Sequence, residues 1–475
     1  MKVKEMSLNQ NEREYVRKVT PAERFFTRSP FAIVTMVVRI RGSVTETMLT
    51  TAVEKVQQRH ALLGVRIEDD HEHAQWFTSA GVRAIPIRTV QRRSEDDWIQ
   101  IHTEALKAPF EFETRPAIRF ILVRSEDISD IIILCHHIIC DGMSLAYLAR
   151  DLMVCLGDPE RPVELLPAPA PVNLKNLPDD VSQSGLAKLL IQRMNQQWME
   201  DGVFFDQEDY QVLAKAYWHH YRHHILSVEL SEAETSSLAA RCREENVTVN
   251  SALTTAFAGA QSDVQGQEPY HARIVVAANL RDRLPDSPGE GMGMYAGGVE
   301  LNFGYQHKRT FWENARRFHK KIQPKIKNKV LFSNILNWLY LEPTIFEAMN
   351  FKKIGRLVLP DSSRYEKLSN FASKEDVVLR LLKRDNLETL EKKYWGTAVT
   401  NLGRLAFPRI YGSLELDRMI FQPGGGIPLA NANLVLGAVT CAGKLSLVVE
   451  YAEEAVDTAT MKKIKDKAVE YLLEG

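Results

Sequence analysis

The residues best suited to chemistry are two adjacent histidines, His136 and His137, which are followed by Asp141 and Gly142. An imidazole titrates near neutral pH, so a neutral histidine can accept the proton of a hydroxyl or amine as that group acts as a nucleophile. A single histidine is enough for this step. The string Cys-His-His-Ile-Ile-Cys-Asp-Gly over residues 135–142 therefore indicates a site of general-base catalysis.

The two histidines cannot share one role, because adjacent residues of a strand point to opposite faces. If His137 faces a cleft, His136 faces the packed interior and is structural. Asp141 lies four residues after His137 and beyond a turn, so a structural ion pair is a better interpretation than a catalytic triad. The alternative is a pair of core histidines, one satisfied by the backbone and the other by Asp141.

The elements around this string are those needed to hold it rigidly. The apolar run over residues 131–139 predicts a buried strand, and it is too short to span a membrane. Asp141 and Gly142 then turn the chain into a helical pattern over residues 143–156. Residues 117–123 predict an antiparallel partner strand, joined through a polar loop. The first half of the chain is thus predicted to be a mixed α/β lobe.

A proline-rich segment separates the two halves of the chain. Six prolines between residues 157 and 178 disrupt regular structure, so we predict a first lobe over residues 1–157, a linker over 158–184 and a second lobe over 185–475. The second half repeats the alternation of strands and helices, and residues 432–451 predict a terminal hairpin. Further predicted elements are strands over 62–67 and 82–87 and a long helix over 330–349.

The His-His-x-x-x-Asp-Gly string resembles the signature of the condensation-domain and chloramphenicol-acetyltransferase-like acyltransferases. This resemblance implies an α/β (α+β) fold of two acetyltransferase-like lobes in a V, with a tunnel between them that reaches the histidine from both faces. It also implies acyl transfer from coenzyme A or a carrier-protein phosphopantetheine to a hydroxyl or amine. His137 would be the catalytic base and His136 its support.

The resemblance also suggests partners for the motif from the second half of the chain. In the superfamily the matching aspartate pairs with an arginine, and the segment Asn279-Leu280-Arg281 is similar to the one that supplies it. We therefore expect Asp141 to pair with Arg281, with Arg283 as the nearby alternative. Two solvated charges are the other interpretation.

Asn401 is a further candidate, in a segment that resembles the Asn-Leu-Gly turn of the family's second lobe. Its side chain could donate a hydrogen bond to the developing oxyanion, or it could fix the turn. The glycines of residues 424–426 lack the Lys-Ser/Thr of a nucleotide-binding loop, so we interpret them as a loop near the substrate.

Metal binding is the main rival interpretation. Histidines at positions 219, 220, 223 and 224 have helical spacing, but no carboxylate or cysteine ligand accompanies them, and a basic patch is the better interpretation. We expect no metal and no permanently bound cofactor. The acyl thioester, either acyl-CoA or an acylated phosphopantetheine on a carrier protein, would be a co-substrate.

Composition excludes several other classes of function. Sixty basic and 61 acidic residues give a formal charge of −1, which supports neither nucleic-acid binding nor a global attraction to anionic membranes. Five cysteines without metal-type spacing and a polar N-terminus suggest a cytoplasmic protein. No apolar stretch approaches the length of a spanning helix. We expect a monomer whose partners are the thioester donor and a small alcohol or amine acceptor.

Within the superfamily, the Asp-Phe-Gly-Trp-Gly hallmark of the plant BAHD branch is absent. A standalone O-acyltransferase or a free-standing condensation enzyme therefore fits better. The alternative of a different class is a non-catalytic module on the same fold that binds a carrier protein.

Overall fold

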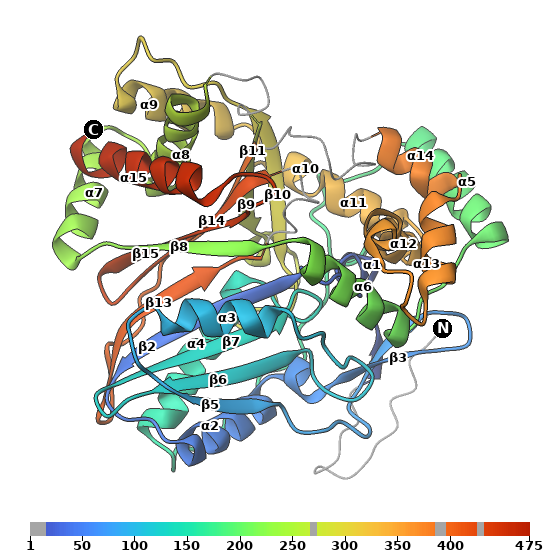
Figure 1. Cartoon of the computed structure of the whole chain (residues 1–475), viewed down its shortest axis with the longest axis horizontal. Helices are drawn as coiled ribbons and strands as arrows, with labels where there is room; N and C mark the ends of the chain where they lie inside the picture. The colour runs from blue at the N-terminus through green and yellow to red at the C-terminus, as the bar shows by residue number, and fades with distance from the viewer. Residues whose placement is uncertain (1–15, 267–272, 385–395, 425–431) are drawn as a thin grey trace.

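The computed structural model describes residues 16–266, 273–384, 396–424 and 432–475, which form two six-stranded sheets with helices around them (Figure 1). A third, smaller sheet has the order β1-β4-β3. Within the described ranges, no helix combines the length and the apolar character that crossing a bilayer requires.

The first large sheet carries the histidine motif and has the order β12-β13-β2-β7-β6-β5. Its central strand β7 is antiparallel to β6, as predicted, and β5 is the one strand of this sheet that pairs in parallel. The strands are β2 (Ile33–Arg41), β5 (Ile87–Gln91), β6 (Ile118–Arg124), β7 (Ile128–His136), β12 (Ile410–Tyr411) and β13 (Leu414–Gln422). Residues 131–135 of β7 are fully buried, so the strand is a rigid support for the histidines at its end.

Three helices complete this lobe. In Figure 1 α3 (Asp97–Leu106) lies in front of the sheet, and α2 (Glu46–Arg59) packs against α4 (Gly142–Gly157). Asp141 is the N-cap of α4, and a reciprocal capping box with Ser144 starts the helix directly after the histidines.

The second sheet has the order β10-β9-β11-β14-β15-β8, and its three strands β9, β11 and β14 run in parallel. The strands are β8 (His223–Glu229), β9 (Arg273–Asn279), β10 (Ala296–Asn302), β11 (Gly396–Arg404), β14 (Ala432–Cys441) and β15 (Lys444–Ala452). The predicted terminal hairpin is confirmed, since β14 and β15 are antiparallel. The helices of this lobe are α7 (Glu232–Glu244), α8 (Val249–Gln265), α9 (Phe311–Ile322) and α15 (Thr458–Glu474).

The remaining elements surround these two sheets. The small sheet consists of β1 (Val16–Lys18), β3 (Arg66–Asp69) and β4 (Gln75–Thr78), and α1 (Pro21–Arg24) lies near it in the chain. A group of helices occupies the right of Figure 1, where α5, α6 and α11–α14 lie near one another. These helices, with α10, are α5 (Gly185–Asp201), α6 (Gln207–His220), α10 (Asn328–Leu331), α11 (Ser333–Tyr340), α12 (Thr344–Ile354), α13 (Tyr365–Ser373) and α14 (Val377–Arg384).

The second half of the chain contributes strand β13 to the first sheet. β13 lies beyond residue 410 in the chain, yet it pairs with β2 along its length and completes the sheet of the first half. The proposed boundaries at 157 and 185 remain a prediction, but the first sheet is not built from one continuous stretch of chain. Gly437 of β14 allows β13 to lie this close to β14, because a Cβ there would lie 2.2 Å from the carbonyl oxygen of Phe421 in β13.

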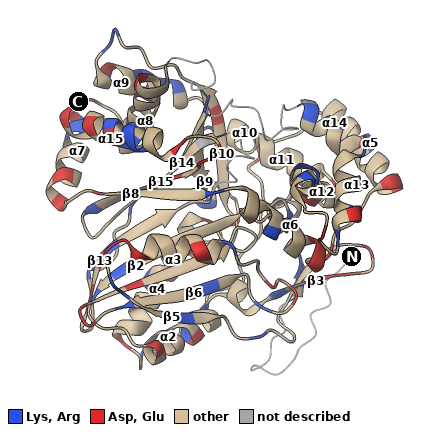
Figure 2. Cartoon of the chain, viewed as in Figure 1, with Lys and Arg blue, Asp and Glu red and all other residues tan. Residues whose placement is uncertain are grey.

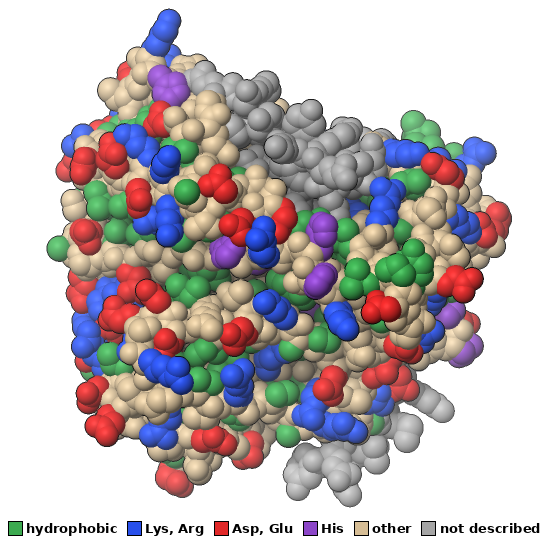
Figure 3. Space-filling model, viewed as in Figure 1, with side chains coloured by type: hydrophobic (Ala, Val, Ile, Leu, Met, Phe, Trp, Pro, Cys, Tyr) green, Lys and Arg blue, Asp and Glu red, His purple; other side chains and the backbone are tan. Residues whose placement is uncertain are grey.

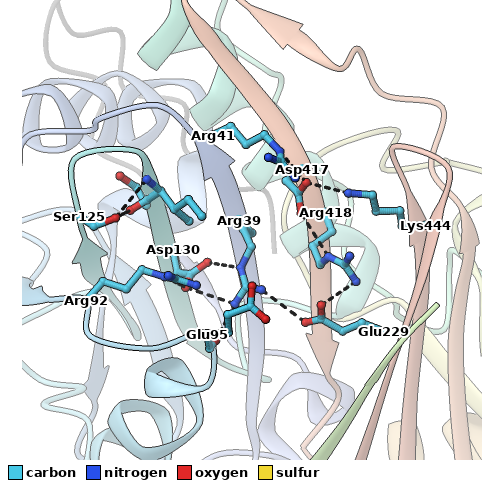
Figure 4. A network of polar contacts seen from close by, with 12 residues as sticks. Arg39, Arg41, Arg92, Glu95, Ser125, Asp130, Glu229, Asp417, Arg418 and Lys444 are labelled. Atoms are coloured by element: carbon cyan, nitrogen blue, oxygen red, sulfur yellow. Dashed lines mark hydrogen bonds and ion pairs between the residues drawn. The ribbon is translucent and has the colours of Figure 1, made fainter. Parts of the chain in front are cut away.

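A polar network also joins the lobes (Figure 4). Glu229 of β8 lies 2.8 Å from Arg418 of β13 and 3.6 Å from Arg39 of β2. Lys444 of β15 lies 2.7 Å from Asp417 of β13. Charges from the second sheet are thus paired with charges on strands of the first sheet.

Three predicted elements are corrected by the structure. Residues 61–64 form a 3-10 turn before β3, and residues 82–86 are irregular with β5 beginning only at Ile87. The long helix predicted over 330–349 is divided among α10, α11 and α12. The break between α11 and α12 coincides with Pro343, which cannot continue the backbone hydrogen-bonding of the preceding helix.

Candidate active site

His137 lies directly after β7 and is fixed by two hydrogen bonds. Its backbone N–H donates to the carbonyl of Ala32 at 2.8 Å, which continues the pairing of β7 with the segment before β2. Its ring Nδ1 lies 3.0 Å from the carbonyl oxygen of Cys140. A carbonyl oxygen can only accept, so Nδ1 carries the proton in the neutral ring and Nε2 keeps its lone pair.

The surroundings of His137 favour this neutral form. Its ring stacks on Phe26 at a centroid distance of 4.5 Å and remains partly exposed. Burial lowers the pKa of His137 below its ordinary value, although the Cys140 carbonyl, the charge of Asp141 and a hydrogen bond to the Pro423 backbone act in the opposite direction. A neutral imidazole with an available Nε2 is the form that can accept a proton.

His136 is buried and uses both ring nitrogens within the protein. Nε2 donates to the carbonyl of Ser29 at 3.1 Å, and Nδ1 accepts from the backbone N–H of Ile138 at 3.3 Å. Burial lowers the pKa of His136 to about 3. This ring therefore stays neutral and holds the loop in which His137 sits.

Asp141 is directed toward the second half of the chain. Its Oδ1 accepts from Arg281 Nη2 at 2.9 Å and from the Ser144 N–H at 2.7 Å, and its Oδ2 accepts from the Tyr295 N–H at 3.0 Å. Burial alone would raise the pKa of Asp141, but the Arg281 charge and the hydrogen bonds from Ser144 and Arg281 hold it below its ordinary value. Asp141 is thus a buried carboxylate that ties the start of α4 to the other lobe.

Arg281 rather than Arg283 is the partner that reaches this carboxylate. The Arg281 side chain is 2% exposed, and its Nη1 donates to the carbonyl of Gly291 at 2.8 Å. Its guanidinium also lies 4.6 Å from the centre of the Tyr295 ring. Arg283 points elsewhere and donates to the carbonyl of Ile326 at 2.8 Å.

The second lobe also contacts the motif at Gly142. A Cβ at this position would lie 2.6 Å from Leu402 Cδ2 and 2.7 Å from Phe421 Cζ, so the absence of a side chain allows the lobes to meet here. The adjacent Asn401 accepts a hydrogen bond from the Gly403 N–H at 2.8 Å through its Oδ1. Residues 401–403 lie within β11, at a register shift, and not in a turn after the strand, so this contact holds an irregularity of β11. The oxyanion role remains a prediction.

Sequence reasoning missed three residues of this region. Ser144 Oγ lies 2.7 Å from Arg281 Nη2, Tyr295 contacts both members of the ion pair, and Phe26 covers the ring of His137. The capping pattern of an aspartate followed three residues later by serine could have identified Ser144. The other two come from distant parts of the chain and left no local signal.

The predicted glycine-rich loop over residues 424–426 is described by the structure only at its first residue. Gly424 has a φ of +67°, and a Cβ there would lie 2.3 Å from the carbonyl oxygen of Ile33, whose residue pairs with His136. The other two glycines of 424–426 lie outside the described residues. The loop therefore begins beside the motif.

The helical face predicted for the four histidines is wrong, because α6 ends at His220 and the last two lie on β8. His223 lies 3.1 Å from Glu450 and 2.8 Å from the Tyr217 hydroxyl. Within the part of the chain that the structure describes, no group of three or more histidine, cysteine or acidic residues could hold a metal ion.

Comparison with known proteins confirms the predicted resemblance for the first lobe. The model of the condensation domain family matches residues 20–171, which include the whole histidine motif. Nonribosomal peptide synthetase kk1B of Curvularia clavata is 33% identical over 124 residues, and nonribosomal peptide synthetase agiA of Aspergillus flavus is 31% identical over 117 residues. Each match covers 24% of this chain and only 1 to 2% of the relative's length.

Solved structures extend the similarity of fold to the whole chain. A trichothecene 15-O-acetyltransferase from Fusarium sporotrichioides has a TM-score of 0.64 at 13% identity, covering 97% of this chain and 96% of the other. The epimerization domain from the third module of tyrocidine synthetase B has a TM-score of 0.60 at 12% identity, covering 98% and 97%. The predicted two-lobe fold is therefore confirmed, whereas the channel between the lobes remains a prediction.

Proposed function

We propose that this chain, which has the condensation-domain fold, transfers an acyl group from a thioester to a hydroxyl or amine with His137 as the general base. The observation that carries the proposal is the hydrogen bond between His137 Nδ1 and the Cys140 carbonyl. This bond orients the ring and leaves Nε2 as the basic atom at the junction of the lobes.

The proposed step balances without a further reactant. Nε2 takes the proton of the acceptor as its oxygen or nitrogen attacks the thioester carbonyl, and a tetrahedral intermediate forms. When the intermediate collapses, the carbon–sulfur bond breaks and the protonated imidazole returns the proton to the departing thiolate. Asp141 takes no direct part, because its oxygens are bound to Arg281, Ser144 and Tyr295.

The second half of the chain supports the geometry of the base. Arg281 draws the start of α4 toward β9, and Leu402 lies on Gly142. We infer that these contacts must hold the two lobes in their relative positions for His137 to meet both substrates. The donor would be acyl-CoA or an acylated phosphopantetheine on a carrier protein, with no permanently bound cofactor.

Mass spectrometry of the purified protein incubated with a panel of acyl thioesters and candidate alcohols or amines tests the proposal. We expect a new ester or amide that depends on His137. Exchange of the α-proton of an aminoacyl thioester without acyl transfer would indicate epimerisation instead, a reaction named for one of the structural relatives. Stable binding of a carrier protein without either reaction would indicate a non-catalytic module.

A further inference from the structure

Helix α5 presents leucines to solvent in an arrangement that is unusual for a globular domain. Leu186, Leu189 and Leu190 are 70%, 63% and 55% exposed, and Trp198 is the one fully buried residue of the helix. Their spacing of three and four residues places them on one face. Figure 3 shows apolar side chains at the upper right, where α5 lies in Figure 1. A contiguous exposed apolar stripe marks an interaction surface.

Contacts at both ends of the leucine stripe hold α5 against α11. Gln183, just before α5, hydrogen-bonds to Asn337 of α11, and Asn195 donates to the carbonyl of Tyr340 at 2.9 Å. Lys188 Nζ lies 5.2 Å from the centre of the Tyr340 ring. The leucine stripe is therefore fixed in place on the fold.

A basic segment precedes α11 in the chain and runs into the short helix α10. Residues 320–329 contain no acidic residue and five lysines, all of them exposed: Lys320, Lys321, Lys325, Lys327 and Lys329. Among the described residues, no carboxylate lies within ion-pair distance of these lysines. Over the rest of the molecule, basic and acidic segments are interspersed (Figure 2). Val330, next to Lys329, is also exposed.

We propose that α5 and the 325–330 segment form a peripheral binding surface for an anionic phospholipid membrane. Leucines on α5 and lysines on the segment before α11, the helix that packs against α5, match the two parts of such a membrane, its acyl chains and its negatively charged head groups. An acidic protein would pair with the lysines but would not explain three exposed leucines on the adjoining helix. The short amphipathic helix α11, which buries Ile335, Leu336 and Leu339 and exposes Asn334 and Asn337, connects the two parts.

The acidic residues of α5 and of the segment before it lie outside the leucine stripe. Arg193 follows the leucines one turn later and is exposed, whereas Glu200 and Asp201 lie at the far C-terminal end of the helix. Asp179 and Asp180 precede the helix and are the nearest acidic residues before the stripe. The proposal does not depend on acyl transfer, so each can fail alone.

Sedimentation of the full chain with vesicles tests the proposal. The vesicles contain phosphatidylcholine alone or mixed with phosphatidylserine, and the measurement is made at low and high salt. We expect binding to the mixed vesicles at low salt that weakens as salt is added, because each lysine near an anionic surface contributes about fivefold in affinity.

Two variants and two matched controls locate the surface. K327E/K329E is expected to lower the affinity at least about 25-fold, the product of two such contributions, and L189Q/L190Q should weaken binding at both salt concentrations. The control K462E/K463E reverses two exposed lysines of α15, and the control L165Q/L359Q replaces two exposed leucines outside α5. Both controls should bind like the wild type.

The proposal is overturned if the wild type does not sediment with the mixed vesicles. It is also overturned if either control weakens binding as much as its matched variant, or if L189Q/L190Q binds like the wild type. In that last case the lysines would be a surface for an acidic partner. All four variants change exposed side chains, and their melting temperatures show whether folding is preserved.

Discussion

The most direct prediction concerns the basic atom of His137. His137→Ala should lower kcat by about two to four orders of magnitude, because it removes the general base, while changing stability little because the ring is partly exposed. Since burial lowers the pKa of His137, kcat/KM should fall only as the pH drops below 6.5, where Nε2 becomes protonated. A pH–rate profile measures this fall of kcat/KM in acid.

His219→Ala is the matched control, because it removes an exposed imidazole from the end of α6. It should leave both the rate and the pH profile unchanged. If His137→Ala kept near-normal turnover, the base would have to be another group. A profile that fell already between pH 8 and 7 would contradict the neutral state assigned to the ring.

A second residue-level prediction concerns the buried pair of Asp141 and Arg281. Either Asp141→Asn or Arg281→Gln should lower the free energy of unfolding by roughly 3–5 kcal/mol, because each leaves its partner buried without a counter-charge. Urea denaturation of both single variants and the double variant gives the coupling energy. Arg283→Gln is the control, since Arg283 bonds to Ile326 and Asn328 instead.

The same pair predicts a dependence on pH. The pKa of Asp141 is lower in the folded protein than in the unfolded chain, so its stabilising contribution is complete above about pH 4 and is lost as the pH falls through the lowered pKa. The difference in stability between the wild type and Asp141→Asn should therefore shrink in acid. Additive effects of the two substitutions would show that the residues are not paired.

At the scale of elements, strand β13 is the feature on which the junction of the lobes depends. Gly437→Ala should lower stability by about 1–3 kcal/mol, because the new Cβ would meet the backbone of Phe421, which cannot turn away as a side chain can. The shift of β13 should also reduce acyl transfer. Thermal unfolding and turnover of the same preparation measure both effects.

Gly304→Ala is the matched control, because a Cβ at Gly304 would meet no atom within 4 Å. It should behave like the wild type in both measurements. Equal losses in the two variants would mean that the contact between β14 and β13 is not the cause.

Which elements the sequence could predict depends on the range of the interactions that form them. β7, the turn at Asp141 and α4 follow from an apolar run and a local cap, and they lie close to where they were expected. The placement of β13 in the first sheet was not predictable, because its pairing with β2 joins residues almost 400 positions apart. The break between α11 and α12, by contrast, has a local signal in Pro343, which the predicted long helix did not take into account.

The same distinction applies to the site. Residue types and spacing identified His137 and Asp141, and the resemblance suggested Arg281. The proton on Nδ1, however, depends on the position of the Cys140 carbonyl, and the cover over the ring is Phe26, which lies more than 100 residues earlier in the chain. Local sequence therefore predicts which atoms could react, whereas the folded chain determines their orientation.

At the scale of the whole molecule, we predict that donor and acceptor reach His137 from opposite ends of one channel between the lobes. Phe26, from the first half of the chain, stacks on the imidazole, while from the second half Leu402 lies over Gly142 and the Pro423 backbone hydrogen-bonds to His137. The base is therefore bordered by both halves. A thin pantetheine arm can enter along one side of such a junction while the acceptor uses the other.

Kinetics of Phe26→Ala and Asn401→Ala test this arrangement, because each removes a partly exposed side chain from a different border. We expect Phe26→Ala to raise KM for one substrate and Asn401→Ala to raise KM for the other, each by about tenfold, the equivalent of about 1.4 kcal/mol of lost contact. Asn401→Asp is the control for the contact within β11, since its carboxylate can still accept from the Gly403 N–H. If both alanine variants raised KM for the same substrate, the two borders would belong to one entrance, and the channel would not be open at both ends.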